Sequence, residues 1–473
     1  MANVVMTGGG IVGLLTGMLL ARDGHDVTIL ERDPSPPPDD PTEAWESWSR
    51  KGVNQFHMLH FLLPRFRAIV EAELPDLPPG LDAAGALRLN PITGIPEAVT
   101  GGFRDGDEVF ESVTGRRPMV ESVVARAAAD ARGVDVRRGT AVAGLVTGPS
   151  DIPGVPHVVG VRTDDGEEIT ADVVVDTSGR RSPLPAWLQE IGARPPLEAR
   201  EDSGFVYFGR HFRSGDGSVP AALGGLLQGY GSVSTLTLPA DNGCWGAGFI
   251  TSARDAPLRA LRDVETWTRA WRAFPLVAHW ADGAPLSDSV AVMAKIEDRS
   301  RRFCIAGEPV ATGVLAVGDS WACTNPSLGR GISIGVMHGL ALRDVLRKAL
   351  DGPADLATAW DDATESSVAP WYRSTLHYDR HRLAEIEAVI RGEEYEPEDP
   401  VWELTRAMES ASSKDAEVLR ARLSVVGLLR TGDEVLARGD VAERVVRLGS
   451  DWRNEPPAGP DRAQLLALVA GGA

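Results

Sequence analysis

The order of apolar and polar positions predicts a βαβ unit at the start of the chain. The apolar run "NVVMT" leads into three glycines, and the apolar stretch "IVGLLTGMLLAR" (11–22) is followed by a second apolar run, "DVTIL" (26–30). Such runs on either side of a helix-length apolar stretch are typical of two buried strands joined by a helix. The next segment, "DPSPPPDDP" (33–41), is expected on the surface, because proline lacks the amide donor that helices and central strands need.

Residues 119–131 have a helical pattern, and the three alternating segments after them predict a small antiparallel meander. These segments are "VDVRRGTAVAGLV" (134–146), "HVVGVRTDDG" (157–166) and "ITADVVVDTSG" (169–179), and the last of them returns to a buried strand.

The pattern of apolar and polar residues changes after residue 200. Apolar runs separated by Gly, Pro and Asp predict a β-rich unit up to residue 300, with one helix near Val264–Phe274. "TGVLAVGDS" (312–320) is another buried strand, a helix is expected over 334–350, and the chain is helical and charged from about residue 354. At 473 residues the chain is too long for one core. We therefore expect an α/β protein with a Rossmann-like domain, a β-sheet domain and a helical C-terminal region.

Composition excludes several classes of protein. The formal net charge is −19 and no block of Lys or Arg offsets it, so nucleic acid and membranes are not expected partners. Cys244, Cys304 and Cys323 lie far apart without a CxxC pair, which argues against a disulfide framework and against a zinc site and suits a reducing compartment. The apolar stretch near the N-terminus has no basic segment before it and no cleavage site after it, so we expect a buried helix and a cytoplasmic protein.

The first candidate site is the glycine motif between the first strand and the first helix. Gly8, Gly10 and Gly13 form a GxGxxG pattern, in which the glycines allow a tight turn, close approach of a pyrophosphate and packing of the helix on the sheet. The amide groups at the helix start favour phosphate. Glu31 ends the second strand 18 residues after Gly13, close to the spacing of a carboxylate that binds a ribose hydroxyl. The motif predicts a dinucleotide site and leaves NAD and FAD both open.

Two further stretches favour FAD. A hydrophobic strand ends in a D-x-x-G-x-x-S pattern that starts at Asp176 and contains Gly179. Another strand ends in Gly318-Asp319, and the residues that follow before a helix are Pro326, Gly329 and Gly331. The carboxylate of Asp319 can accept hydrogen bonds from ribityl hydroxyls. Bare amides at the helix start can hold the electron-rich edge of a ring that becomes anionic on reduction.

The order GxGxxG…ER, DxxGxxS and GD…PxxGxG resembles the class A FAD-dependent monooxygenases of the aromatic-hydroxylase and squalene-epoxidase type, over residues 3–350. Within that superfamily, "SRKGVNQFHMLHFLLPRF", "DTSGRRSP" and "DSGFVYFGRHF" are similar to flavin epoxidases that tailor polyketides into polyethers. The resemblance implies an FAD-binding domain at 1–184, completed by 301–350, a β-sheet substrate domain at 185–300 and a helical region at 351–473.

The resemblance also implies roles for individual residues. It assigns Glu31 and Arg32 to the adenosine end, Arg50 and Gln55 to the flavin path, Val142 to adenine, Asp319 to the ribityl–pyrophosphate region and Gly331-Ile332 to the pyrimidine edge of the flavin. One position departs from the family, because Glu121 stands in "RRPMVESVV" where an Arg is usual. Either Arg116 or Arg117 replaces that Arg from the preceding turn, or the pyrophosphate contact is lost.

The activity implied is that of an FAD-dependent monooxygenase of secondary metabolism. Reduced flavin reacts with O2 to give a C4a-hydroperoxide, whose distal oxygen passes to a small apolar unsaturated substrate by alkene epoxidation or by hydroxylation. NAD(P)H or a partner flavin reductase would supply the electrons. The alternatives are a flavin reductase or dehydrogenase of the geranylgeranyl-reductase type, a flavin-dependent halogenase and a non-catalytic flavoprotein.

Other features have simpler interpretations. "WESW" (45–48) resembles the Trp pair of flavin-dependent halogenases but lacks their W-x-W-x-I-P continuation. His57 with His60, and His377 with His381, have helical spacings that suit a metal ion, but neither pair has a third ligand nearby in sequence, so packed or solvated roles are expected and no metal. Most of the twelve tryptophans are expected to fill the core. No nucleophile motif stands out and no catalytic side chain is assigned, which fits a flavin that carries the chemistry.

Overall fold

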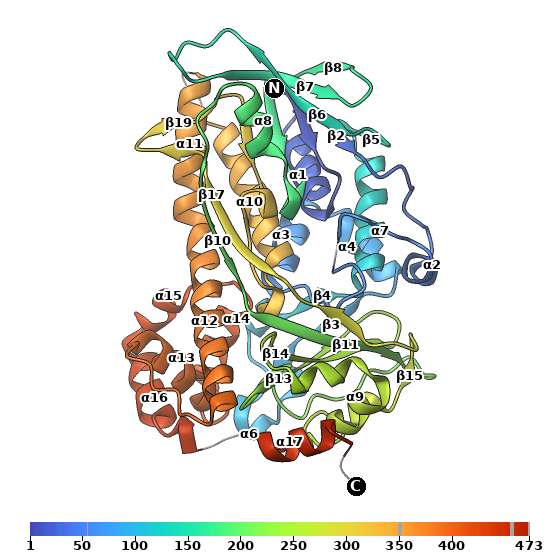
Figure 1. Cartoon of the computed structure of the whole chain (residues 1–473), viewed down its shortest axis with the longest axis vertical. Coiled ribbons are helices and arrows are strands. Elements are labelled where there is room, and N and C mark those ends of the chain that lie inside the picture. Colours follow the sequence, from blue (N-terminus) through green and yellow to red (C-terminus); the bar gives the residue numbers. More distant parts are fainter. Residues whose placement is uncertain (54, 349–351, 455–457, 472–473) are drawn as a thin grey trace.

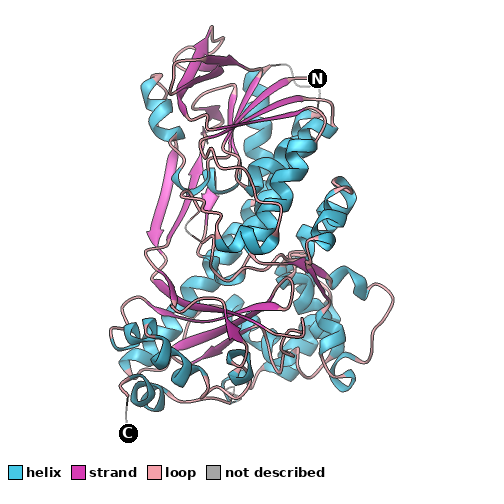
Figure 2. Cartoon of the chain, turned by 90° about the vertical axis from the view of Figure 1, so that its right-hand side faces the viewer, coloured by secondary structure: helices cyan, strands magenta, loops and turns pink. Residues whose placement is uncertain are grey.

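The computed structural model describes residues 1–53, 55–348, 352–454 and 458–471. A parallel sheet lies in one half of the molecule and a mostly antiparallel sheet in the other, and the long helix α12 (Ala369–Arg391) runs from one half to the other (Figure 1). Figure 2 shows the two halves from the side, joined by long paired strands. The predicted α/β architecture with a helical C-terminal region is confirmed.

The first half is built on five parallel strands in the order β20-β9-β1-β2-β5. They are β1 (Asn3–Thr7), β2 (Asp26–Glu31), β5 (Val134–Arg138), β9 (Val173–Asp176) and β20 (Val314–Ala316). Helix α1 (Ile11–Arg22) packs on the sheet between α7 (Arg117–Asp130) and α10 (Gly331–Leu346). The carboxyl ends of the strands meet at one edge, which brings together motifs that are far apart in sequence.

Two glycines of the first turn are required by the packing of α1. Gly8 has a φ of 113°, and a Cβ there would lie 2.7 Å from the carbonyl oxygen of Thr177. A Cβ at Gly13 would lie 2.3 Å from the carbonyl oxygen of Gly8. Neither site has room for a side chain, so both glycines are needed for the turn to form at all.

The predicted meander starts later in the chain than the sequence suggested. It contains β6 (Val142–Gly148), β7 (His157–Thr163) and β8 (Glu168–Thr170). Residues 134–138 instead form β5, which pairs with β2 at the edge of the parallel sheet. Because an edge strand is covered incompletely, β5 alternates between half-buried and exposed residues and resembles an antiparallel strand.

The second half contains a six-stranded sheet in the order β12-β13-β14-β11-β15, with β16 also paired to β11. The strands are β11 (Phe205–Arg213), β12 (Leu227–Tyr230), β13 (Val233–Pro239), β14 (Cys244–Ser252), β15 (Ala284–Pro285) and β16 (Ala291–Met293). Helices α9 (Val264–Trp271) and α17 (Arg462–Val469) cover one face through a core that includes Trp267, Trp271 and Phe249. Tyr207 and Ile250 lie on the opposite face, in a separate core cluster.

A third sheet joins the halves. It contains β10 (Leu197–Asp202), β17 (Glu297–Arg302) and β21 (Ala322–Cys323). The sequence predicted one strand across "SVAVMAKIED", but the chain leaves β16 at Met293 and enters β17 at Glu297. Lys295 lies between them with a φ of 56°, a conformation that no continuous strand contains.

The C-terminal helices are α11 (Pro353–Ser367), α12, α13 (Pro400–Ala411), α14 (Ala416–Val426), α15 (Gly432–Leu436), α16 (Gly439–Gly449) and α17. Leu419 of α14 packs on Ile92 and Phe110, so this region is attached to the N-terminal part of the chain. The remaining elements are α2 (Pro41–Glu46), α3 (Pro64–Glu73), α4 (Leu77–Ala83), β3 (Leu87–Leu89), α5 (Pro91–Gly94), α6 (Glu97–Thr100), β4 (Ser112–Thr114), α8 (Leu184–Glu190), β18 (Cys304–Ile305) and β19 (Glu308–Pro309).

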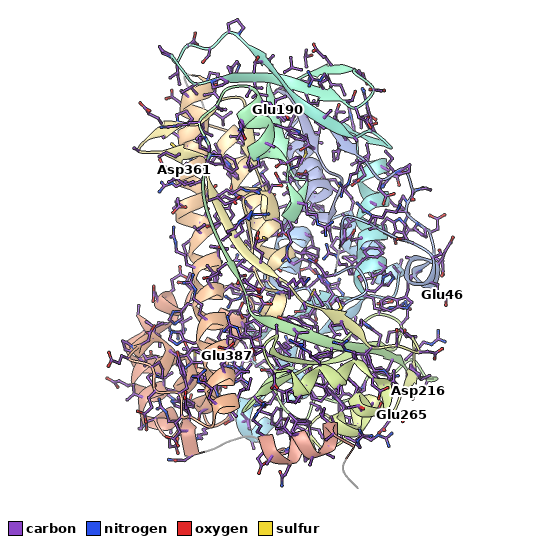
Figure 3. All side chains as sticks on the ribbon, viewed as in Figure 1. Glu46, Glu190, Asp216, Glu265, Asp361 and Glu387 are labelled. Carbon is purple, nitrogen blue, oxygen red and sulfur yellow. The ribbon has the colours of Figure 1, made fainter. Side chains whose placement is uncertain are left out.

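Acidic side chains are spread over both halves of the molecule. Those labelled in Figure 3 come from six separate places in the chain: Glu46, Glu190, Asp216, Glu265, Asp361 and Glu387. None of the six is buried. Within the described part of the chain, no helix combines the length and the apolar character needed to cross a bilayer.

Candidate functional site

One cavity of about 1840 Å³ extends from the edge of the parallel sheet to the antiparallel sheet and the C-terminal helices. Its wall includes the turn after β1, the end of β2, the loop before α10, the inner face of β11, β13 and β14, and parts of α13 and α14. Ligand pockets usually enclose roughly 300–1,000 Å³. The cavity is therefore large enough for a dinucleotide and a second molecule beside it.

Nearly all of the site residues predicted from sequence meet in this cavity. Those that line it are Gly8, Gly10, Gly13, Glu31, Arg32, Arg50, Gln55, Val142, Gly179, Asp319, Pro326, Gly329, Gly331 and Ile332. The exception is Asp176, which is fully buried behind the wall. It accepts hydrogen bonds from the hydroxyl of Thr7 (2.9 Å), the amide of Ser178 (3.0 Å) and the hydroxyl of Ser182 (2.5 Å). Asp176 thus fixes the turn that carries Gly179.

At the end of β2, the carboxylate of Glu31 is held by several donors. It accepts hydrogen bonds from the amide of Gly9 (3.0 Å) and from the guanidinium of Arg50 (2.9 Å), and its other oxygen accepts from the amide of Asp33 (2.8 Å). Both Glu31 and Arg50 are buried. Glu31 therefore has a fixed orientation at the place where the sequence predicts the adenosine half of a dinucleotide.

Glu121, at the position where the family usually has an Arg, belongs to the same buried network. Its carboxylate binds Arg50 on one side (3.2 Å) and Arg117 on the other (2.6 Å). Arg117 also lines the cavity. Arg116 instead forms a buried ion pair with Asp241 (2.6 Å). Of the two candidates for the missing pyrophosphate contact, Arg117 is the one that reaches the cavity, and Glu121 holds its guanidinium in position.

The loop between β20 and α10 forms the opposite wall. The hydroxyl of Ser320 accepts a hydrogen bond from the amide of Gly179 (2.9 Å), so this loop meets the turn after β9. Burial raises the pKa of the Asp319 carboxyl, and the guanidinium groups of Arg180 and Arg117 oppose that rise. A Cβ added at Gly331, the first residue of α10, would meet no protein atom within 4 Å. The helix start is therefore bare backbone open to a ligand.

A buried polar cluster supports this loop from behind. The side-chain oxygen of Asn325 accepts a hydrogen bond from the hydroxyl of Tyr207 (2.7 Å), and the backbone amide of Asn325 donates to the carboxylate of Asp298 (2.5 Å). Ser327 donates to Asp379 on α12 (2.5 Å). Burial raises the pKa of Asp379 to about 7 and that of Asp298 to about 6. Two buried carboxyls that titrate near neutrality thus lie directly behind the cavity wall.

Asp379→Asn is expected to stabilise the protein more at pH 8 than at pH 5.5. The folded-state pKa lies above the usual value of 3.8, so the folded protein holds this proton more tightly than the unfolded chain does, and stability falls as pH rises from about 4 to 7. The neutral side chain of Asn resembles the protonated acid, and its oxygen can still accept the hydrogen bond from the hydroxyl of Ser327. The gain in the free energy of unfolding should grow by about 2 kcal/mol between the two pH values.

Urea denaturation of wild type and variant at both pH values measures this difference. Asp298 and Arg330 also face Asp379, and both stay unchanged in the comparison. Asp361→Asn, the same substitution on α11, is the matched control and should show no such growth with pH. A gain for Asp379→Asn that is constant or shrinks with pH would show that the carboxyl is charged in the folded protein throughout.

Of the remaining candidates from sequence, the two tryptophans of "WESW" lie outside the cavity wall and His60 belongs to it. Trp48 is buried against Phe56, and Trp45 lies near His57 and His211; neither tryptophan is among the described residues that line the cavity. His60 does line it, and burial lowers the pKa of its ring to about 3, with Arg117 as a further cause. The sequence singles out His60 only as a partner of His57 for a metal ion, whereas in the structure its neutral imidazole is a polar group of the cavity wall.

Comparisons with known proteins bear on the fold that carries this cavity. No protein-family model matches the chain. Protein Rv3254 of Mycobacterium tuberculosis is 28% identical over 401 residues, or 79% of this chain and 79% of that protein. The solved structure of PqsL, a probable FAD-dependent monooxygenase from Pseudomonas aeruginosa, has a TM-score of 0.58 at 16% identity and covers 82% of this chain and 99% of its own.

The structure of OxyS anhydrotetracycline hydroxylase from Streptomyces rimosus has a TM-score of 0.54 at 17% identity, covering 91% of this chain and 76% of its own. The fold is that of FAD-dependent monooxygenases. This likeness extends over both halves of the molecule, so the parallel sheet and the antiparallel sheet on either side of the cavity belong to one known architecture. At these identities the likeness concerns the fold alone, and the chemistry depends on the residues of this chain.

Proposed function

We propose that this protein binds FAD in the large cavity and uses it to insert one atom of O2 into a small apolar unsaturated substrate, by epoxidation or by hydroxylation. The observation that carries the proposal is the single cavity that contains three separate nucleotide- and flavin-type motifs at one end and an apolar sheet at the other. NAD(P)H or a partner flavin reductase is the proposed source of electrons. The closer epoxidase assignment within this class rests on the sequence resemblance.

The residues of the upper cavity fit FAD. Gly10 starts α1 with nothing within 4 Å of an added Cβ, so a pyrophosphate can approach the helix start closely. Arg117, which lines the same cavity, would supply a guanidinium to the pyrophosphate, and Glu31 would bind a ribose hydroxyl. Asp319 offers a carboxylate to ribityl hydroxyls, and the amides of Gly331 and Ile332 offer donors to the flavin ring. When bound, FAD supplies the reducing equivalents and the activation of O2.

The lower cavity fits an apolar substrate. Leu236, Leu238 and Ile250 of the sheet line one side. Leu404 and Met408 of α13 line another. Such walls exclude water from the reacting atoms, which matters because in a wet site the activated oxygen is released as hydrogen peroxide instead of passing to the substrate. Among the polar groups that line the cavity, the hydroxyl of Tyr207 and the neutral ring of His60 can orient a hydroxyl or carbonyl of the substrate.

The reaction class can be tested in a single turnover. Protein loaded with FAD is reduced chemically without oxygen, mixed with candidate polyenes or phenols, and divided between anaerobic and aerobic samples. The proposal predicts an oxygenated product in the aerobic sample alone. A hydrogenated product without oxygen would establish the reductase alternative, a halogenated product in the presence of halide the halogenase alternative, and a flavin that resists reduction the non-catalytic one.

A further inference from the structure

In the structure, a third candidate metal ligand lies next to the pair His377 and His381, for which the sequence showed no third ligand nearby. His377 and His381 lie four residues apart on one face of α12. Asp399, which precedes α13, lies against both of them. One ligand atom from each of the three residues lies within 4.8 Å of the other two, and no other such group of three is found among the described His, Cys, Asp and Glu residues.

We propose that His377, His381 and Asp399 bind a divalent transition-metal ion of the Zn²⁺ type. The oxygen Oδ2 of Asp399 lies 3.1 Å from Nε2 of His381 and 3.7 Å from Nδ1 of His377. Ligand atoms about 2.0–2.2 Å from a tetrahedral zinc ion lie about 3.3–3.5 Å from one another, so small rotations complete the geometry. Two imidazoles and one carboxylate leave a fourth position for water.

The partners of these side chains support a metal ion over a simple hydrogen-bonded cluster. Asp399 uses only Oδ1 to cap α13, where it accepts from the amides of Val401 (2.8 Å) and Trp402 (3.4 Å), so Oδ2 is available to a metal ion. The hydroxyl oxygen of Tyr395 lies 2.8 Å from Nδ1 of His381. If Nδ1 carries the proton and donates to this hydroxyl, Nε2 is left free to bind a metal ion.

The surrounding charge also favours a cation. The segment that leads to Asp399 reads "EEYEPED" (393–399) and carries five acids, and the whole chain has a net charge of −19. Four of the acids are exposed, so they contribute a negative potential around the cluster without occupying it. The ligand set itself would carry a charge of −1 with neutral imidazoles, which a divalent ion converts to +1.

The ion would join α12 to the start of α13. No helix or strand connects Gly392 to Asp399. The start of α13 is tied to α12 by Asp399 and by Trp402, whose ring stacks on His381 at 4.9 Å, and Glu403 ties it to Arg453. Helix α13 contributes Val401, Leu404 and Met408 to the cavity wall. The proposed metal therefore stabilises the wall of the lower cavity from outside, and it takes no part in the redox chemistry.

The test is zinc binding to the full chain, without an affinity tag and after removal of metal with a chelator. Calorimetric titration should give one site per chain with micromolar or tighter affinity, accompanied by a rise in melting temperature. His377→Ala and Asp399→Asn should each weaken binding at least about tenfold, and Tyr395→Phe by about tenfold through the orientation of His381. Asp399→Asn is the key variant, because Asn retains the helix cap.

His157→Ala is the matched control. His157 binds Thr312 (2.9 Å) in the other half of the molecule, so zinc affinity and the thermal shift should equal those of wild type. Absence of zinc binding by the wild-type chain would overturn the proposal, and so would equal affinity in wild type, His377→Ala and Asp399→Asn. Replacement by Co²⁺ gives an independent readout, since a tetrahedral site of this kind absorbs at longer wavelengths than flavin and the variants should lose that absorption.

Discussion

Gly10→Val is expected to abolish FAD binding in a protein that still folds. Gly10 has φ −73° and ψ 168°, which any residue can adopt, and a Cβ there meets no protein atom within 4 Å. The added isopropyl group would project into the cavity at the start of α1, where a pyrophosphate needs close contact with backbone amides. We expect affinity for FAD to fall by about a hundredfold or more, as measured by fluorescence titration.

Two other glycine substitutions separate this effect from loss of structure. Gly439→Val lies at the exposed first residue of α16, also with nothing within 4 Å, and should leave both the fold and FAD affinity unchanged. Gly13→Val should instead prevent folding, because its Cβ would lie 2.3 Å from a carbonyl oxygen. Normal FAD affinity in folded Gly10→Val would mean that the pyrophosphate does not lie at this helix start.

Asp319→Ala should weaken FAD binding about ten- to a hundredfold without unfolding the protein. The carboxyl lies at the cavity wall near the guanidinium groups of Arg180 and Arg117, and a charged hydrogen bond to a ribityl hydroxyl contributes roughly 1.5–3 kcal/mol. Burial raises the pKa of the carboxyl, so its removal relieves a desolvation cost, and the variant should melt no lower than wild type.

The matched control is Asp216→Ala, the same change at an exposed acid of the lower half (Figure 3). Circular dichroism confirms folding of each variant before titration. If folded Asp319→Ala bound FAD as tightly as wild type and Asp216→Ala do, the loop before α10 would have no part in holding the cofactor.

The parts of the fold that could be predicted from sequence are those specified by local patterns. Strand β1, helix α1 and strand β2 follow from short apolar runs and glycines within the first 31 residues. The motifs that end β9 and β20 could be placed together because carboxyl ends of parallel strands meet at one edge. This rule needs no knowledge of side-chain packing. All of the predicted cofactor-binding residues except Asp176 line the cavity at that edge of the sheet.

What could not be predicted depends on contacts between distant elements. The sequence marks Glu121 as unusual but does not show that Arg50 and Arg117 lie on either side of it. The third member of the histidine cluster, Asp399, lies 18 residues beyond His381, in a loop whose path no motif fixes. Asp176 has the motif of a ligand-binding acid, yet its hydroxyl partners turn it away from the cavity. Tertiary contacts decide the role of such residues, and composition alone does not.

The central claim is that the cavity supports transfer of one oxygen atom from O2 to an apolar substrate. The most direct test uses ¹⁸O2. FAD-loaded protein is reduced without oxygen, given the polyene or phenol that is converted in the single-turnover test, and then exposed to ¹⁸O2 in ordinary water, with mass spectrometry of the product. The account predicts a product that contains one ¹⁸O atom per molecule, with the second atom of O2 found in water. A product whose new oxygen is unlabelled, or a product that forms equally well without O2, would contradict it.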